Sequence, residues 1–382
     1  MVTLDTTSQM GSRKARHYAF PQGHSSGKDT MNASHGTSGT AVQPTADKVT
    51  LIDGYVPVID LSSAWTGGPE GRRAVGRALG EVCEHSGFLA VAGHGVSETV
   101  IAEMYRATQE FFALPLSEKK RLLADPDDPL MRGFGRPGSL AASNADASLD
   151  RERALPDISE TYTINKLGEP ASPGLPSDAD PHLKLPNKWP ELPRFAEAYR
   201  AYYAAMENLA REIMRLFALA LDLPESWFDD KIDEHMTNMT ANYYPAQPDP
   251  PEPGRARKGH HSDWGCLTIL YQDGAPGGLQ VLDKAERWVE VPAIASTFVI
   301  NIGDLMARWT NDRWVSTVHR VVNPPRAVAM CERYSVPFFY QPNYGAVIEC
   351  IPTCTDPGNP PKYGPITSGA YIMDKFRRAY GN

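Results

Sequence analysis

The sequence predicts a mainly β protein with helices packed on the outside of a sandwich or small barrel. From Thr237 onward, short β-rich runs are mostly bounded by Gly, Pro, Asn or Asp, which is typical of antiparallel strands joined by turns. Before that point, residues 195–220 repeat apolar side chains at every third or fourth position, which predicts one long amphipathic helix. A helix with such a continuous apolar stripe must cover another layer of the fold.

The chain before these strands divides into two regions. Residues 1–50 are rich in Ser, Thr, Gly and His and have neither helical nor strand periodicity, so we expect a disordered tail. Residues 51–235 combine strands such as "YVPVIDL" and "GFLAVAGHGV" with helices, and we expect this region to pack on the β core. A long loop predicted between Asp125 and Asp150 is a candidate for binding, since long loops of compact domains often carry function.

The β-rich runs occupy residues 236–345, which we expect to form the core of the protein. Residues 346–382 follow as a C-terminal segment with a helix near "YIMDKFRRAY". Residues 51–382 are therefore expected to form one compact unit.

Composition excludes several classes of partner. The net charge of −8 and the pI near 5.7 argue against nucleic acid, because no basic stripe is present to meet phosphates. No apolar run approaches the roughly 18 residues that cross a bilayer, and no signal peptide is visible. The five cysteines are scattered without a CxxC pair, which indicates neither a disulfide framework nor a zinc knuckle and favours the cytoplasm. The sequence does not indicate an oligomeric state.

The stretch "KGHHSDWGCLTILYQD" contains a candidate metal site. His261 and Asp263 are two residues apart, a spacing that directs both side chains to one face of a strand. His319 in "WVSTVHRVV" is the natural third ligand, because it belongs to another predicted strand of the same core. Two imidazoles and a carboxylate would leave about three open positions on an octahedral ion, as in non-haem Fe(II) oxygenases. Taken alone, a His-x-Asp pair is more often a packed pair without a metal, and Trp264 is expected to pack in the core.

Three longer motifs resemble a known family. They are "HSDWGCLTILYQDGAPGGLQV", "NIGDLMARWTNDRWVSTVHRVV" and "RYSVPFFYQPN", and in this order they are similar to the catalytic half of the isopenicillin N synthase-like family of 2-oxoglutarate and Fe(II)-dependent dioxygenases. "NYYP" upstream matches a further motif, and the N-terminal half agrees more loosely. The resemblance covers about Val56 to Tyr380 and implies a double-stranded β-helix (jelly-roll) core with α-helices packed outside.

The resemblance also implies roles for particular residues. The positions that match the iron ligands are His261, Asp263 and His319. Arg333 and Ser335 match a pair that binds the distal carboxylate of 2-oxoglutarate, and a guanidinium with a neighbouring hydroxyl suits that group because it offers parallel donors. The family indicates that Tyr244 donates to the same carboxylate and that Asn242 helps to orient the metal-bound end, although "NYY" could equally be a packed edge strand.

The activity implied is oxidation of a small organic molecule by hydroxylation, desaturation or cyclisation, with release of succinate and CO2. The cofactors implied are Fe(II), 2-oxoglutarate and O2, with ascorbate as a stimulant. Related halogenating enzymes lack the carboxylate ligand, whereas this sequence has Asp263 at that position. Two alternatives stay open: an oxidase like isopenicillin N synthase itself, which uses no 2-oxoglutarate, and a barrel that binds a metal and a ligand without turnover.

Substrate contacts are expected from the loosely matching N-terminal half and from the end of the last motif. The candidates are Arg132, Phe134, Glu160, Tyr162 and Phe339. The first four follow from the tendency of loops to carry specificity, and each could instead pack within its own loop or strand. Phe339 shares a strand face with Arg333, where it could either roof the pocket or fill the barrel.

Overall fold

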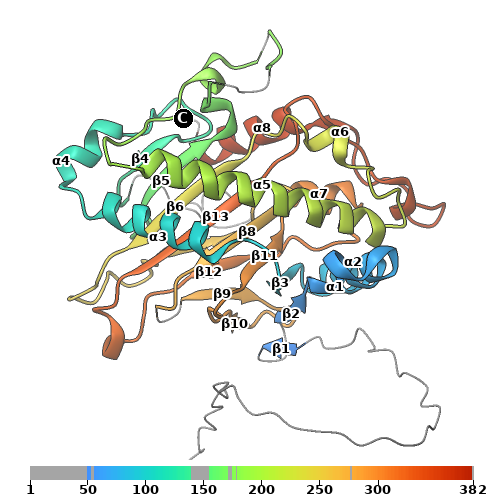
Figure 1. The fold of residues 1–382 in the computed structure, drawn as a ribbon, viewed down its shortest axis with the longest axis horizontal. Coiled ribbons are helices and arrows are strands. Elements are labelled where there is room, and N and C mark those ends of the chain that lie inside the picture. The colour runs from blue at the N-terminus through green and yellow to red at the C-terminus, as the bar shows by residue number, and fades with distance from the viewer. Residues whose placement is uncertain are drawn as a thin grey trace, which may run out of the picture. The chain divides into compact units, whose positions relative to one another are not determined.

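The computed structural model describes residues 50–52, 56–138, 155–170, 174–177, 179–275 and 278–380, drawn in colour in Figure 1. All of them belong to one unit that extends from Ala46 to Asn382. Of the tail expected over residues 1–50, only Thr50 is among the described residues. In the loop expected from Asp125 to Asp150, residues 139–150 lie outside them.

The N-terminal half contains both strands and helices. Its elements in chain order are β1 (Thr50–Ile52), β2 (Val56–Asp60), α1 (Ser62–Thr66), α2 (Gly68–His85), β3 (Phe88–Ala92), α3 (Glu98–Phe112), α4 (Leu116–Lys119), η1 (Lys120–Leu122), β4 (Gly133–Gly135), β5 (Glu160–Asn165), η4 (Lys166–Gly168), η5 (Pro181–Lys184), α5 (Phe195–Ala220) and α6 (Asp229–Ile232).

The C-terminal half is rich in strands. Its elements are β6 (Asn238–Tyr244), β7 (Lys258–His261), β8 (Leu267–Gln272), β9 (Leu279–Leu282), β10 (Trp288–Glu290), β11 (Phe298–Ile302), α7 (Asp304–Trp309), β12 (His319–Val321), η6 (Arg326–Val328), β13 (Arg333–Tyr340), β14 (Val347–Ile348), η7 (Pro352–Cys354), β15 (Ile366–Thr367) and α8 (Ser368–Tyr380).

Two sheets form the core. The large sheet has nine strands in the order β1-β2-β3-β11-β8-β13-β6-β5-β4, and the small sheet has four in the order β10-β9-β12-β7. Strands β11, β8, β13 and β6 together with the four strands of the small sheet make the jelly-roll, and β1 to β5 extend the large sheet at both ends. The predicted jelly-roll with flanking helices is therefore confirmed.

Helix α5 covers one face of the large sheet, with α3 beside it (Figure 1). Its bounds are those of the predicted helix, and its apolar stripe is buried. The Tyr203 ring meets Phe338 of β13 edge-on at 4.9 Å between centroids. Each fully buried aromatic or aliphatic side chain of this stripe contributes about 1.5–3 kcal/mol to folding.

Strand β13 divides its side chains between two environments. Tyr334, Val336, Phe338 and Tyr340 belong to the hydrophobic core that includes α5, whereas the alternate residues from Arg333 to Phe339 line a cavity on the other face. Strand periodicity alone produces this division. No helix in the described part of the chain is long and apolar enough to cross a membrane.

Candidate active site

The two predicted histidines lie opposite each other on neighbouring strands of the small sheet. His261 ends β7 and His319 begins β12, and the two residues are directly paired across the strands. Asp263 lies two residues beyond β7, with its Oδ1 3.8 Å from the Nε2 atom of each histidine. All three side chains are buried, and their ligand atoms lie within 4.8 Å of one another. The three residues can therefore share one metal ion.

Strand alternation is not what places Asp263, in contrast to the sequence-based argument. β7 ends at His261, so Asp263 belongs to the loop that follows. Thr268 Oγ1 and Asn301 Nδ2 both donate to its Oδ2, at 2.6 and 2.7 Å. The N–H of Asp304 donates to its backbone carbonyl at 2.7 Å. These contacts fix the carboxylate with Oδ1 turned toward the histidines.

Hydrogen bonds also select the form of each imidazole. Nδ1 of His261 lies 2.8 Å from the Gly259 carbonyl, and Nδ1 of His319 lies 3.1 Å from the Thr317 carbonyl. A carbonyl only accepts, so each Nδ1 donates, and in the neutral ring Nε2 is then the nitrogen whose lone pair can bind a metal. Burial, followed by the neighbouring His319, lowers the pKa of His261 to about 3. His261 is therefore a neutral donor at physiological pH.

The pKa of Asp263 is lowered despite its burial. Burial alone would raise it, but the two histidines and the hydrogen bonds from Asn301 and Thr268 outweigh that effect. Two imidazole nitrogens and one carboxylate are the donor set of a 2-His-1-carboxylate iron centre.

The second group of predicted residues faces the same cavity from the large sheet. Arg333 and Ser335 on β13 pair in register with Tyr244 and Asn242 on β6, and all four line the cavity together with the three candidate metal ligands. Arg333 is only 2% exposed, and its Nη2 donates to Gln272 Oε1 at 2.7 Å. Its Nη1 is buried without a hydrogen-bond partner. A buried guanidinium with a free donor fits a ligand carboxylate, since a buried donor left unpaired is costly.

A second buried guanidinium lies close to this group. Arg257 is fully buried, and its Nη2 donates to the Cys331 carbonyl at 3.0 Å, whereas Nε and Nη1 have no hydrogen-bond partner. Arg257 and Arg333 lie 5.7 and 5.1 Å from the centre of the Tyr244 ring. Burial and the neighbouring charge of Arg333 lower the pKa of Arg257. Sequence reasoning missed this residue, because it precedes the recognisable motif.

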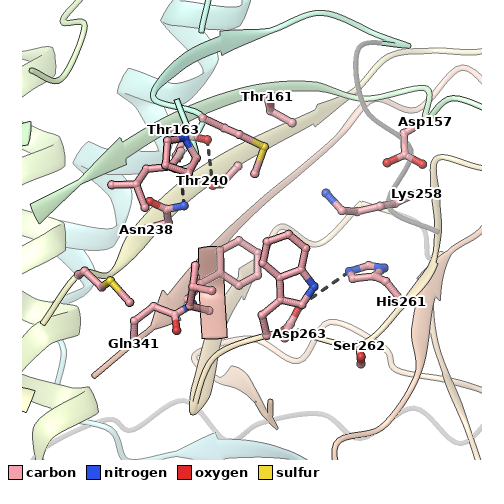
Figure 2. Close-up of a pocket in the computed structure, with 17 residues that line it drawn as sticks. Asp157, Thr161, Thr163, Asn238, Thr240, Lys258, His261, Ser262, Asp263 and Gln341 are labelled. Carbon is pink, nitrogen blue, oxygen red and sulfur yellow. Dashed lines mark hydrogen bonds and ion pairs between the residues drawn. The ribbon is translucent and has the colours of Figure 1, made fainter. Parts of the chain in front are cut away.

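Beyond the candidate metal ligands the cavity widens into a larger pocket, shown in Figure 2. Its lining combines apolar side chains with a few polar ones and comes from segments far apart in the sequence: Pro129, Leu130, Met131, Asp157, Thr161, Thr163, Met236, Asn238, Thr240, Lys258, His261, Ser262, Asp263, Trp264, Phe339, Gln341 and Ile372. Trp264 packs against the hydrophobic core, in agreement with the sequence-based expectation. It also lines this pocket, because it lies in the loop after β7, where strand alternation no longer applies.

Of the five candidate substrate contacts, Phe339 faces both parts of the cavity. The other four lie elsewhere. Arg132 is fully buried in an ion pair with Asp128, 2.9 Å between Nε and Oδ2, and Glu160 pairs with Lys119 at 2.5 Å. The remaining two belong to the hydrophobic core, where they pack around one phenylalanine ring: Phe134 and Tyr162 against Phe111.

Strand alternation in β5 explains this difference. Glu160 and Tyr162 point away from the cavity, whereas Thr161 and Thr163 line it. The predicted segment therefore reaches the pocket through the opposite face of its strand. Without knowing which face of β5 is covered by helices, sequence reasoning cannot choose between the two sets.

The fold and this constellation define a class of protein, the non-haem iron oxygenases with a jelly-roll core. Residues 56–192 match the family model described as "non-haem dioxygenase in morphine synthesis N-terminal", and residues 236–342 match the 2OG-Fe(II) oxygenase superfamily. A 2-oxoglutarate-Fe(II) type oxidoreductase of Emericella nidulans is 33% identical over 332 residues, which cover 85% of this chain and 90% of the relative. The chain belongs to the 2OG-Fe(II) oxygenase superfamily.

Two further similar proteins are associated with different small molecules by their printed names. Homoarginine-6-hydroxylase of rice is 32% identical over 303 residues, 78% of this chain and 87% of the relative. Full-length T7H of Neurospora crassa, solved with alpha-KG and thymine, superposes with a TM-score of 0.73 at 28% identity and covers 86% of this chain and 99% of its own.

The family membership establishes the reaction class. The protein is an oxidoreductase that uses Fe(II), 2-oxoglutarate and O2 and oxidises a small organic molecule with release of succinate and CO2. The comparisons favour neither the oxidase without 2-oxoglutarate nor the barrel without turnover.

Proposed function

We propose that this enzyme holds its cofactors with seven residues. Three bind Fe(II) and four bind 2-oxoglutarate: His261, Asp263 and His319 for the metal, and Arg333, Ser335, Tyr244 and Asn242 for the co-substrate. The observation that carries this proposal is the unpaired Nη1 of the buried Arg333, in the same cavity as the two histidines and the aspartate.

Each group of residues has a distinct task. Fe(II) with bound 2-oxoglutarate supplies the activation of O2 and the oxidation of the substrate. The protein orients these partners: Arg333 and Ser335 neutralise and fix the distal carboxylate, and Thr268 and Asn301 hold Asp263 in place. The cavity walls limit access of water to the reacting centre. No side chain is required as a separate general base.

The substrate is proposed to occupy the pocket of Figure 2, with Phe339 between it and the co-substrate. Homoarginine and auxin occur in the names of two similar enzymes, and T7H was solved in complex with thymine. These molecules support a free small molecule as the substrate class. Hydroxylation, desaturation and cyclisation are all compatible with this arrangement. Ascorbate is expected to stimulate turnover.

The protein is proposed to act in the cytoplasm, without a nucleic-acid or membrane partner. All five cysteines are free, as a reducing compartment would keep them, and the net charge of −8 disfavours binding to phosphates.

Succinate production tests the proposed function without knowledge of the substrate. Purified protein is incubated with Fe(II), 2-oxoglutarate, ascorbate and O2, and succinate is measured. We expect slow uncoupled release of succinate that requires both Fe(II) and 2-oxoglutarate and is absent in His319→Ala. O2 consumption that does not depend on 2-oxoglutarate would instead indicate the oxidase, and no reaction with any small molecule tried would indicate a binding protein.

A further inference from the structure

Lys258 occupies an irregular position in the small sheet. His319 of β12 pairs with His261 of β7, and Val321 of β12 pairs with Lys258 of β7. The two pairs are separated by two residues along β12 but by three residues along β7. The extra residue of β7 is a β-bulge, which changes the direction of the neighbouring side chains. Without the bulge, Lys258 and His261 would lie on opposite faces. With it, both line the cavity.

The ammonium group of Lys258 has little to neutralise it. Its Nζ donates to Asn242 Oδ1 at 3.3 Å, a long bond to a neutral acceptor. No ion pair joins it to a carboxylate in the part of the chain that the structure describes, and Figure 2 shows its side chain in the pocket. An ammonium carries three donors, so donors remain for a ligand.

The partners of other lysine ammonium groups in the described chain differ from that of Lys258. Four lysines that are half-buried or buried pair with a carboxylate at 2.5 to 2.7 Å: Lys119 with Glu160, Lys166 with Glu207, Lys231 with Asp230 and Lys375 with Asp304. The half-buried Lys188 instead donates to the Leu123 carbonyl. Lys258 lies in a cavity beside two histidines, and among the described residues its Nζ has only the long contact to Asn242. Removing a charge from water without a counter-charge is unfavourable, so an anion in the cavity would be stabilised.

The two carboxylates of the pocket lining are already engaged. Asp263 accepts two hydrogen bonds on Oδ2 and directs Oδ1 toward the histidines. Asp157 accepts a hydrogen bond from the Gly259 N–H at 2.9 Å. Much of the remaining lining is apolar: Leu130, Met131, Met236, Trp264, Phe339 and Ile372. The pocket therefore suits a molecule with a hydrocarbon or aromatic body and one anionic group.

We propose that Lys258 is a specificity-determining residue that binds the carboxylate of an apolar acid, the substrate of this enzyme. The inference rests on the proposed function, because it assigns Arg333 and Ser335 to 2-oxoglutarate and leaves Lys258 to the substrate. A carboxylate bound beside His261 would hold the acid with its neighbouring carbon atoms close to the metal ligands.

The test compares acids with their own amides. Phenylacetic, 3-phenylpropionic and 4-phenylbutyric acid and the corresponding primary amides are titrated anaerobically into the protein loaded with Fe(II) and 2-oxoglutarate, and affinities are measured by calorimetry. We expect at least one acid to bind wild type roughly 10-fold more tightly than its amide, as for a charge-assisted hydrogen bond. This preference disappears in Lys258→Met and persists in Lys258→Arg. Lys284→Met, which removes an exposed lysine, serves as the matched control and keeps the preference.

The visible charge-transfer band of the Fe(II)–2-oxoglutarate complex distinguishes failure of the proposed role of Lys258 from failure of the proposed function. If the band is normal but no acid binds better than its amide, or if the preference survives in Lys258→Met, the inference is wrong and the proposed function stands. A band that requires much more 2-oxoglutarate in Lys258→Met assigns the lysine to the co-substrate and also overturns the inference. A wild-type protein without the band contradicts the proposed function, and the inference falls with it.

Discussion

The two ends of the cavity are built in different ways. At the 2-oxoglutarate end, Arg333, Ser335, Tyr244 and Asn242 come from two adjacent strands in direct register. At the substrate end, the lining comes from loops, strands and the C-terminal helix between Pro129 and Ile372. The first end therefore depends on local strand geometry, whereas the second depends on the packing of the whole chain. This difference is what allows one reaction centre to be combined with different substrate pockets.

Loss of the metal-binding carboxylate is expected to have the largest effect. Asp263→Ala removes one of the three candidate ligands and should abolish Fe(II)-dependent succinate formation. The variant should still fold because the hydrophobic core is untouched, with a lower unfolding midpoint because Thr268 and Asn301 lose their acceptor. Glu290→Ala, an exposed carboxylate on the same small sheet, is the control and should keep full activity. Full activity in Asp263→Ala would exclude the proposed iron site.

Loss of Arg333 is expected to affect the co-substrate alone. Arg333→Ala removes a charge-assisted contact of about 1.5–3 kcal/mol, which corresponds to a roughly 10- to 150-fold rise in KM for 2-oxoglutarate. The measurement is the dependence of succinate release on 2-oxoglutarate concentration. Arg287→Ala, whose side chain is 77% exposed, should show no change. An unaltered KM in Arg333→Ala would move the carboxylate site elsewhere.

A smaller effect is expected from the residues that hold Asp263. Asn301→Ala removes one of the two hydrogen bonds to Oδ2 and leaves that of Thr268. Loss of such a supporting contact typically lowers metal affinity by about 10- to 100-fold, and we expect a value near the lower limit because one bond remains. Competition for Fe(II) with a chelator measures it. Combining Asn301→Ala with Thr268→Val should weaken binding further, and an unchanged affinity in the double variant would contradict this role.

The smallest effect concerns the two faces of β5. Tyr162→Phe removes a hydrogen bond of 2.8 Å from the hydroxyl to the Lys188 carbonyl, on the face away from the cavity. We expect a loss of about 1 kcal/mol in the free energy of unfolding, measured in urea, with no change in KM for 2-oxoglutarate. Thr161→Val alters the cavity face of the same strand and is the comparison variant for ligand binding. A changed affinity for the acids in Tyr162→Phe would place that ring in the pocket after all.

The same contrast explains how far the sequence could be interpreted. The long helix α5 and the alternation of Arg333, Ser335 and Phe339 on β13 follow from local periodicity, which a sequence displays directly. The expected positions of Arg132 and Tyr162 did not follow, because burial of one strand face rather than the other is decided by distant helices. Arg132 could not be identified as a structural residue until its ion pair with Asp128 was seen.

Irregular backbone accounts for the remaining differences between the positions expected from the sequence and those in the structure. β7 ends at His261, so alternation could not position Asp263 or Trp264, and the supporting bonds come from Thr268 and Asn301 further along the chain. The bulge at Lys258 has no signature in the sequence, because it exists only in the pairing of β7 with β12. Periodicity therefore does not predict the positions of Asp263, Trp264 and Lys258 in the cavity.

The central claim is that one cavity binds Fe(II) through its two histidines and aspartate and 2-oxoglutarate through Arg333. Anaerobic titration of the metal-free protein with Fe(II), followed by 2-oxoglutarate, tests it most directly. We predict a weak visible metal-to-ligand charge-transfer band that is absent in His319→Ala and that requires more 2-oxoglutarate in Arg333→Ala. A band of normal intensity in His319→Ala, or iron binding without any band in wild type, would contradict the claim.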